Sequence, residues 1–288
     1  MFRKPLIIVI VTTALVIMAC GVNINLPLKD IKTGPTETEQ INIAKPDISG
    51  TVDLTLAFGA GELTVNPGAK EGLVTGEATY NVPDFKPVIT SSGSQVKIEE
   101  GNLNVNGIPD FQDKVKNTWD LQLSDTPLNL KINAGAYVGK YDLGGLSIKN
   151  LEISDGASDA NLTFSTPNQS SMDVFRYTTG ASNVSLNNLA NANFSTMIFR
   201  SGAGSYHLDF SGELKQDMAV SVDSGISTLV ITIPEGVAAQ VSFSGNLTNV
   251  DISGAWTKNG DVYSQTGSGS KITIIVKMGA GNLELRNK

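Results

Sequence analysis

An internal repeat between Leu130 and Ile233 constrains this chain more than any other feature of its sequence. A glycine, usually followed by an alanine, recurs there in steps of 21, 24, 22 and 23 residues. The glycines of this central series are Gly135, Gly156, Gly180, Gly202 and Gly225. Repeats of about 20 to 50 residues are typical of solenoids or arrays, whose units bury their apolar faces only by stacking on one another.

Apolar residues fall into four columns when the copies are aligned on that glycine. The columns lie five and three positions before the glycine and four and six positions after it, with Gly139 as the exception in the third column. The column at −3, for example, holds Ile132, Ile153, Tyr177, Phe199 and Val222. Apolar residues two apart indicate a strand with one buried face. Each copy is therefore expected to be two short strands that meet at a corner and point these columns inward.

Alternation also predicts an exterior. Lys131 and Arg176 lie four positions before their glycines, and Arg200 and Lys277 lie two positions before theirs. We expect these four side chains to point outward. Solvated surface charge is the ordinary role for such residues.

Two outlying copies share the register, around Gly59 near the start of the folded part and around Gly279 at its end. Glycine adopts positive φ at low cost, and we expect the corners to use this freedom. The expected structural corners are Gly59, Gly135, Gly156, Gly180, Gly202, Gly225 and Gly279.

The repeat predicts an all-β fold, a β-helix-like solenoid with coils of about 22 residues that stack at about 4.8 Å. An antiparallel sandwich or barrel is the alternative, since paired short strands at near-regular spacing also occur there. A constant register over five consecutive copies favours the solenoid. Residues 81–129 and 246–270 depart from the register, and we expect irregular structure there, of the kind that caps a solenoid or decorates it.

The N-terminus indicates export and lipid attachment. Arg3 and Lys4 precede a mostly apolar run of about thirteen residues, shorter than the roughly 20 that span a bilayer. The run ends in Ile17-Met18-Ala19-Cys20-Gly21, which resembles a bacterial lipobox. We expect residues 1–19 to be a lipoprotein signal peptide and Cys20 to carry the lipid, because two acyl chains give stable anchoring. Residues 20–40 would form a lipidated tether, and 41–288 the ectodomain.

Composition excludes several functional classes. The formal net charge is −7 and becomes −9 without Arg3 and Lys4, which argues against nucleic acid as a partner. One cysteine excludes disulfides within the mature chain, and one histidine excludes a multi-histidine metal site. No sequence pattern indicates a cofactor.

The chain resembles the bacterial toast-rack family of envelope proteins, which is related to cell-wall-active antibiotic response proteins. The resemblance covers about residues 41–288 and rests on Leu54-Thr-Leu-Ala-Phe-Gly-Ala-Gly-Glu-Leu-Thr-Val65, on Asn129-Leu-Lys-Ile-Asn-Ala-Gly-Ala136 and on Leu143-Gly-Gly-Leu146. It implies a solenoid-like ectodomain in the bacterial envelope, with no catalytic residues to carry over. The chain lacks the multi-helix segment of the membrane-embedded relatives.

Few residues suggest chemistry. His207 lies between inward positions and is expected at the surface. Asp155 and Asp159 could contribute to a calcium site, although hard cations need six or more oxygen ligands. Asp142 and Asp209 are expected to face outward, about 14 Å apart by strand spacing, which is wider than the carboxyl pair of a glycosidase.

These observations predict a non-enzymatic, lipid-anchored envelope protein that acts as a structural, adhesin-like or interaction module. Its partners would be the membrane, through the lipid on Cys20, and an envelope protein or polysaccharide. The alternatives are a polysaccharide lyase or hydrolase, and a sensor of envelope stress that works through a partner. Outward carboxylates that converge with a Lys or Arg in one groove would favour the enzyme.

Overall fold

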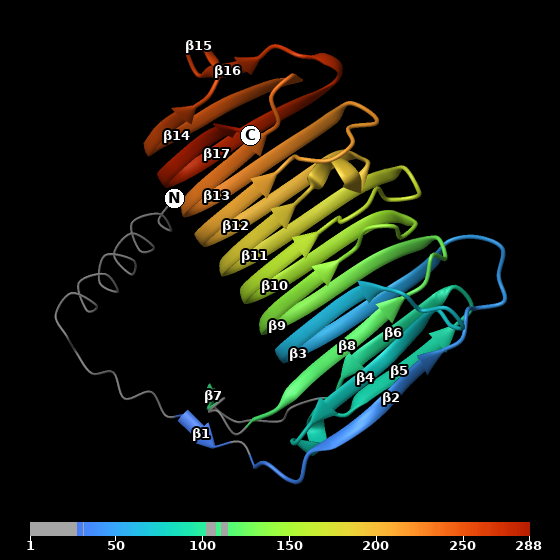
Figure 1. Cartoon of the computed structure of the whole chain (residues 1–288). Helices are drawn as coiled ribbons and strands as arrows, with labels where there is room; N and C mark the ends of the chain where they lie inside the picture. Colours follow the sequence, from blue (N-terminus) through green and yellow to red (C-terminus); the bar gives the residue numbers. More distant parts are fainter. Residues whose placement is uncertain (1–27, 31, 102–107, 111–114) are drawn as a thin grey trace, which may run out of the picture.

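The computed structural model describes residues 28–30, 32–101, 108–110 and 115–288, and its main body is a stack of long bent strands (Figure 1). The prediction for Cys20 and the signal peptide falls outside these residues. The long strands are β3 (Val52–Pro67), β9 (Leu128–Asp142), β10 (Ile148–Thr163), β11 (Met172–Asn187), β12 (Phe194–Asp209), β13 (Met218–Ile233), β14 (Val237–Ser253) and β17 (Ser268–Asn287). The short elements are β1 (Leu28–Asp30), β2 (Glu37–Ile43), β4 (Val74–Tyr80), η1 (Pro83–Phe85), β5 (Pro87–Ser92), β6 (Gln95–Glu100), β7 (Ile108–Asp110), β8 (Asn117–Leu123), η2 (Leu189–Ala192), β15 (Thr257–Asn259) and β16 (Val262–Gln265).

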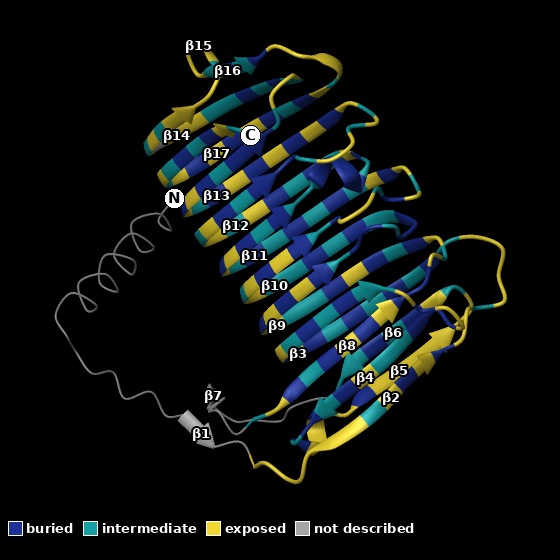
Figure 2. Ribbon diagram, viewed as in Figure 1, coloured by how far each residue is buried: buried dark blue, intermediate teal, exposed yellow. Residues whose placement is uncertain are grey.

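The solenoid is confirmed, because neighbouring long strands run parallel and in the predicted register. Leu130 pairs with Leu151, Leu151 with Phe175, and Phe175 with Met197, so each apolar column forms a ladder along the stack. The columns are buried in all five central copies and in both outlying ones, and Gly139, which interrupts the third column, is buried as well. Buried and exposed residues alternate along the strands (Figure 2). Position 139 holds a glycine because the rings of Tyr137 and Tyr141 occupy the space that a larger side chain would need.

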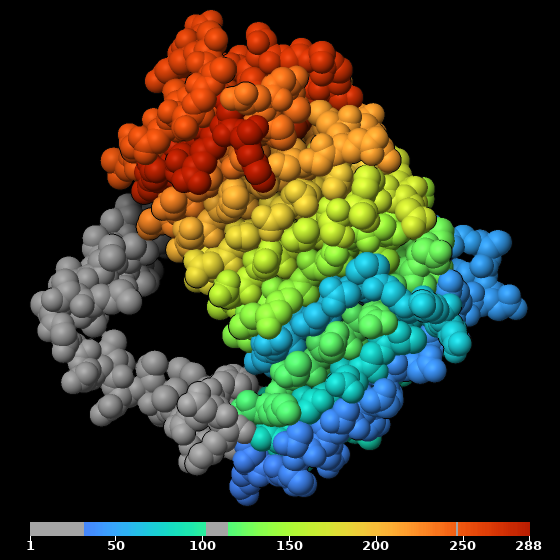
Figure 3. Space-filling view, viewed as in Figure 1, coloured from blue at the N-terminus to red at the C-terminus, as the bar shows by residue number. Residues whose placement is uncertain are grey.

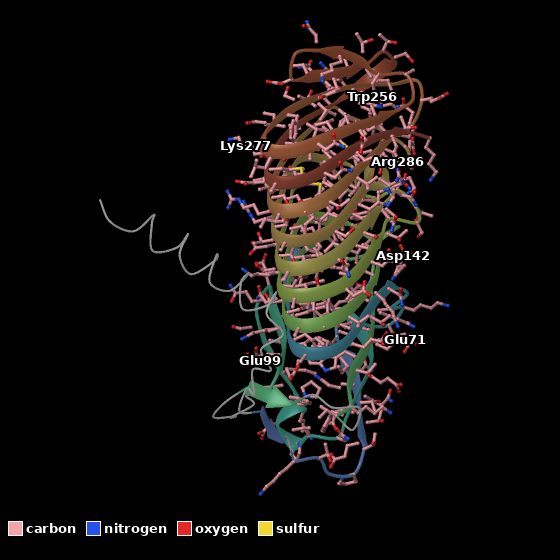
Figure 4. The ribbon with its side chains drawn as sticks, turned by 90° about the vertical axis from the view of Figure 1, so that its left-hand side faces the viewer. Glu71, Glu99, Asp142, Trp256, Lys277 and Arg286 are labelled. Carbon is pink, nitrogen blue, oxygen red and sulfur yellow. The ribbon has the colours of Figure 1, made fainter. Side chains whose placement is uncertain are left out.

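Each coil consists of one bent strand and a return segment. We call the residues before the corner the first arm and those after it the second arm. Seen side-on, Glu99 and Lys277 project from the first-arm side, and Asp142 and Arg286 project from the second-arm side (Figure 4). Return segments bury apolar residues such as Phe164 and Phe210 between the arms, so one hydrophobic core runs through the stack.

The corner glycines lie directly on one another, for a different reason from the one expected. None of the seven has positive φ. A side chain at Gly180 would instead place its Cβ 2.3 Å from the carbonyl oxygen of Gly156, and one at Gly202 would lie 2.6 Å from that of Gly180. Close backbone contact between coils therefore requires glycine. Positive φ occurs two residues later, at Gly61, Gly204 and Gly281.

The order of strands in the stack differs from their order in the chain. The outlying copy β3 pairs with β9, and the last copy, β17, inserts between β13 and β14. In the space-filling view β3 lies as a blue-cyan band between the green bands of β8 and β9 (Figure 3). The two outlying copies are thus integral coils.

One coil was missed by the sequence pattern. Residues 246–270 were expected to be irregular, but β14 is a full bent strand that pairs with β17, with Val241 opposite Ile274 and Val250 opposite Leu283. Its corner position holds Asn246 where the other copies have glycine, which hid the repeat. The departure is limited to the segment between β14 and β17, which carries β15 and β16.

Shorter strands cover the ends of the stack. At the N-terminal end β6 and β5 extend the first arm of β3, while β8, β4 and β2 extend its second arm. Residues 81–129 therefore depart from the register of the repeat, as expected, and their strands cap the N-terminal end of the stack. The cap begins at Glu37 in β2, four residues before the expected ectodomain boundary. At the other end β16 and β15 cover the first arm of β14.

Candidate functional site

A polar groove crosses the outer face of the first arms, perpendicular to the strands. Two rows of outward side chains form its walls, six and four positions before the corner glycine. The hollow over β3, β9, β10 and β11 has a volume of about 390 Å³. We call it, with its continuation over β6, the outer groove. The wall residues used below are Asp53, Thr55, Gln95, Lys97, Asn129, Lys131, Asn150, Glu152 and Arg176.

One wall is a ladder of amides that ends on a carboxylate. Asn150 donates from Nδ2 to Oδ1 of Asn129 at 2.9 Å, and Asn129 donates from Nδ2 to Oδ1 of Asp53 at 2.7 Å. Parallel in-register strands place equivalent positions about 4.8 Å apart, which lets neighbouring amides bond along the stack. The ladder fixes the side chains and leaves further amide donors and acceptors for a ligand.

The other wall carries alternating charge. Lys131 bonds Glu152 at 2.8 Å, and the two side chains are 46% and 43% exposed. Such exposed ion pairs contribute about 0–1 kcal/mol to stability. A charged group of a ligand can therefore replace one partner of the pair at little cost in free energy. Arg176 follows on the next strand and makes no ion pair with the described residues.

The groove continues onto the β5–β6 hairpin. Asp53 and Thr55 line both the main hollow and a second hollow bounded by Thr90, Gln95 and Lys97. Gln95 pairs with Asp53 and Lys97 with Thr55, so both walls extend by one strand. The groove therefore spans five neighbouring strands: β6, β3, β9, β10 and β11.

The groove does contain the mixture of carboxylates and cations that an enzyme would need. Asp53 and Glu152 are two strands and two residues apart, which separates their Cα atoms by about 12 Å. Glycosidase carboxyl pairs lie about 5 to 9.5 Å apart. Each carboxylate here is already bonded, one to an amide and the other to Lys131. The arrangement suits hydrogen bonding to a polar ligand better than hydrolysis.

Asp155 and Asp159 point to opposite sides of the sheet. Asp155 turns inward just before its corner and accepts hydrogen bonds from the hydroxyls of Tyr137, Tyr177 and Thr179. Burial raises the pKa of Tyr177, which keeps that hydroxyl protonated as a donor. Asp159 is exposed. Across the described part of the chain, no three His, Cys, Asp or Glu residues are grouped to hold a metal ion.

Asp142 and Asp209 close turns. Asp209 is only 5% exposed, contrary to the expectation that it faces outward, because the return segment folds over it. It accepts hydrogen bonds from the backbone N–H and the hydroxyl of Ser211. Asp142 accepts the N–H groups of Gly144 and Ser165. Asp142 is therefore bonded to backbone N–H groups, and Asp209 is bonded to Ser211 and also pairs with Lys288 at 3.4 Å, so both carboxylates have a structural role.

His207 is only partly exposed and shares a hydrogen bond of 3.0 Å with the hydroxyl of Thr232 on the next coil. Burial lowers the pKa of His207, so the imidazole is held neutral.

Sequence reasoning placed Lys131 and Arg176 outside but did not connect them with Asp53, Asn129, Asn150 and Glu152. The available signal was the row six positions before the corner, which reads Asp, Asn, Asn in consecutive strands of the stack. It was hidden because β3 is separated from β9 by the whole N-terminal cap in the sequence.

Helices contribute little to the described part of the chain, and none of them is long and apolar enough to cross a membrane.

Solved structures with related shapes are distant. A candidate cell adhesion protein from Clostridium sporogenes matches with 15% identity and a TM-score of 0.44, over 88% of this chain and 99% of its own. A candidate adhesin from Bacteroides fragilis matches with 9% identity and a TM-score of 0.33, over 89% and 99%. A candidate lipid-binding protein from Parabacteroides distasonis matches with 12% identity and a TM-score of 0.37, over 88% and 99%.

No curated protein matches the chain. A family model does: the one described as the N-terminal domain of toast_rack, DUF2154, matches residues 32–176, which include the N-terminal cap, β3, β9, β10 and the start of β11. The matched region thus contains β6, β3, β9 and β10 and the part of β11, up to Arg176, that lines the outer groove. The chain belongs to the toast-rack family.

Proposed function

We propose that the protein is a non-enzymatic, lipid-anchored module of the bacterial envelope that binds a polysaccharide along its outer groove. The observation that carries this proposal is the groove itself. It crosses five strands of the stack, and its walls carry amides, a hydroxyl, two ion-paired lysines, the apolar Val174 and the guanidinium of Arg176, which makes no ion pair with the described residues. An extended polar polymer is the kind of ligand that a long polar groove accommodates, and extended solenoid faces are common binding surfaces.

Anchoring is part of the same proposal. Residues 1–19 would direct export, and Cys20 would carry the lipid after cleavage. The segment from Cys20 to the start of β2 at Glu37 would then hold the stack away from the membrane. Replacement of Cys20 by Ser tests this directly. We expect the variant to lose metabolic labelling by a fatty acid, and labelling that persists in Cys20→Ser would exclude this anchor.

An enzyme that cleaves polysaccharide is the second candidate, because Asp53, Glu152, Lys131 and Arg176 share one groove. The two functions separate in a single experiment. The purified protein is incubated with an array of bacterial and plant glycans, and bound protein and new reducing ends are measured in the same wells. Binding without release supports the proposal. Release that disappears in Glu152→Gln would replace it with the enzyme.

A further inference from the structure

The cations of the outer groove recur at every second strand. Lys97 of β6 pairs with Thr55 of β3, which pairs with Lys131 of β9. Lys131 pairs with Glu152 of β10, which pairs with Arg176 of β11. The wall four positions before the corner thus reads Lys, Thr, Lys, Glu, Arg along the stack. Two strand spacings, about 9.6 Å, separate consecutive cations.

The groove is less negative than the chain as a whole. Its lining contains three cations and two carboxylates, Asp53 and Glu152, within a chain whose formal net charge is −7. Arg176 makes no ion pair with the described residues, and its planar guanidinium can hold a carboxylate through two parallel hydrogen bonds. Lys97 and Lys131 are paired with Glu99 and Glu152, but both pairs are half exposed and can rearrange around an anion.

The spacing discriminates between classes of polyanion. Side chains on one face of an extended peptide lie about 6.8 Å apart, which does not match the cations. A β-linked polysaccharide in extended form repeats once per disaccharide, a length close to two strand spacings. Carboxylates on alternate sugars would therefore meet Lys97, Lys131 and Arg176 in turn. The sugars between them would meet Thr55 on this wall and the amides of Asn129 and Asn150 on the other.

We propose that the outer groove takes an extended acidic polysaccharide with one uronic acid in each disaccharide. This inference rests on the proposed function, because it names the ligand class of the same groove. Arg176 supplies the strongest single contact, and the ladder of Asp53, Asn129 and Asn150 aligns the chain through its hydroxyl groups.

The test compares two soluble oligosaccharides by calorimetry with the full-length lipoprotein in detergent. A hyaluronan octasaccharide carries a carboxylate on alternate sugars, and chitohexaose is a neutral β-linked chain with a similar rise per sugar that is still longer than the groove. We expect hyaluronan to bind at least about tenfold more tightly, with an affinity that falls as salt rises. Arg176→Gln should abolish most of this preference. Lys277→Gln, which removes an exposed cation from the first-arm side beyond the groove, should leave it unchanged.

Each remaining outcome overturns one part of the account. Equal or tighter binding of chitohexaose, with Arg176→Gln and Asn129→Ala both weakening it, would reject the acidic ligand and keep a neutral polysaccharide in the groove. Preference for hyaluronan that survives Arg176→Gln and falls in Lys277→Gln would place the acidic ligand elsewhere. Binding of neither oligosaccharide would overturn both the acidic ligand and the proposed function.

Discussion

The outer face of the first arms differs between its two halves, although the backbone beneath is the same. Over β6, β3, β9, β10 and β11 the outward rows that form the groove are amides, charged groups and the hydroxyl of Thr55, with Val174 as the one apolar member. Over β12, β13, β17 and β14 the row four positions before the corner continues as Ile198, Ser221, Ile275 and Ser242. Ile275 is 50% exposed there. The inward columns stay apolar throughout, so the interior specifies the coil and the exterior is free to specify a ligand.

The largest expected effect comes from substitution of a corner glycine, because the stacked corners belong to both halves. Gly180→Ala would place its Cβ 2.3 Å from the carbonyl oxygen of Gly156, and Gly225→Ala would place it 2.5 Å from that of Gly202. We expect each to lower the free energy of unfolding by about 2–4 kcal/mol, because backbone cannot yield as a side chain can. Chemical denaturation measures this. Gly156→Ala is the matched control, since its contact is 3.1 Å and its cost should be smaller. Equal costs at all three sites would contradict stacking of the corners.

The second prediction separates the two halves. Asn129→Ala removes the middle of the amide ladder, which leaves Asp53 and Asn150 without that partner. We expect polysaccharide affinity to fall about tenfold. The variant loses the hydrogen bond to the charged Asp53, and the remaining side chains of the ladder are no longer held in line. Ser221→Ala alters the other half of the same face and should not change affinity. Isothermal calorimetry on both variants checks this, and a loss in Ser221→Ala would extend the site beyond the groove.

The third prediction lengthens the groove by one coil. Thr196 and Ile198 of β12 continue the two walls next to Val174 and Arg176. The double variant Thr196→Asn, Ile198→Gln gives β12 the amide that β9 and β10 carry in the first wall, and a polar side chain in place of Ile198 in the second. We expect an affinity gain of about two- to fivefold for oligosaccharides long enough to reach β12 and none for shorter ones, since one added polar contact gives about 0.5–1 kcal/mol. An affinity gain of the same size for short and long oligosaccharides would contradict a groove that runs along the stack.

The fourth prediction concerns the N-terminal cap, next to the groove. Glu100 accepts the N–H of Gly59 at 2.7 Å and the side-chain amide of Asn117 at 2.9 Å, where the ladder of corner glycines ends. Burial raises the pKa of Glu100 above its ordinary 4.5. The folded state therefore keeps a proton that the unfolded state has lost, and the free energy of unfolding falls as pH rises through that window.

Glu100→Gln should flatten this pH dependence, because the amide keeps an acceptor for Gly59 and carries no charge. Urea denaturation between pH 4 and 7 measures the slope for both proteins. Asp142→Asn, which changes a carboxylate on the second arms, serves as the control. A slope that is unchanged in Glu100→Gln would show that another group is responsible.

The apolar part of the interior could be predicted from the sequence because positions −5, −3, +4 and +6 bury apolar side chains in nearly every coil. The inward positions before the corner are at −5, −3 and −1, and those after it are at +2, +4 and +6. Asp155 and Thr179 both lie at −1, so the alternation turns them inward at the corner, where they form a hydrogen bond. The acidic side chain of Asp155 gave no reason to expect an inward position. Asp209 was misplaced because alternation along a strand does not describe the return segment that covers it.

The groove could not be predicted, for two physical reasons. Outward positions carry no packing constraint, so no periodicity marks them. Contacts along the stack also join residues far apart in sequence, such as Asp53 and Asn129, which meet only because β3 pairs with β9. β14 escaped detection because its corner holds Asn246 instead of glycine.

The central claim is that the ligand lies in the outer groove, and amide chemical-shift mapping by nuclear magnetic resonance tests it most directly. The isotope-labelled protein is titrated with the hyaluronan octasaccharide. The account predicts that shifts concentrate on the first arms of β3, β9, β10 and β11 and on β6, and that the ligand concentration needed to reach half of each shift rises about tenfold in Asn129→Ala. Shifts that concentrate on β12, β13 or the second arms, or that saturate at the same ligand concentration in Asn129→Ala as in the unchanged protein, would contradict it.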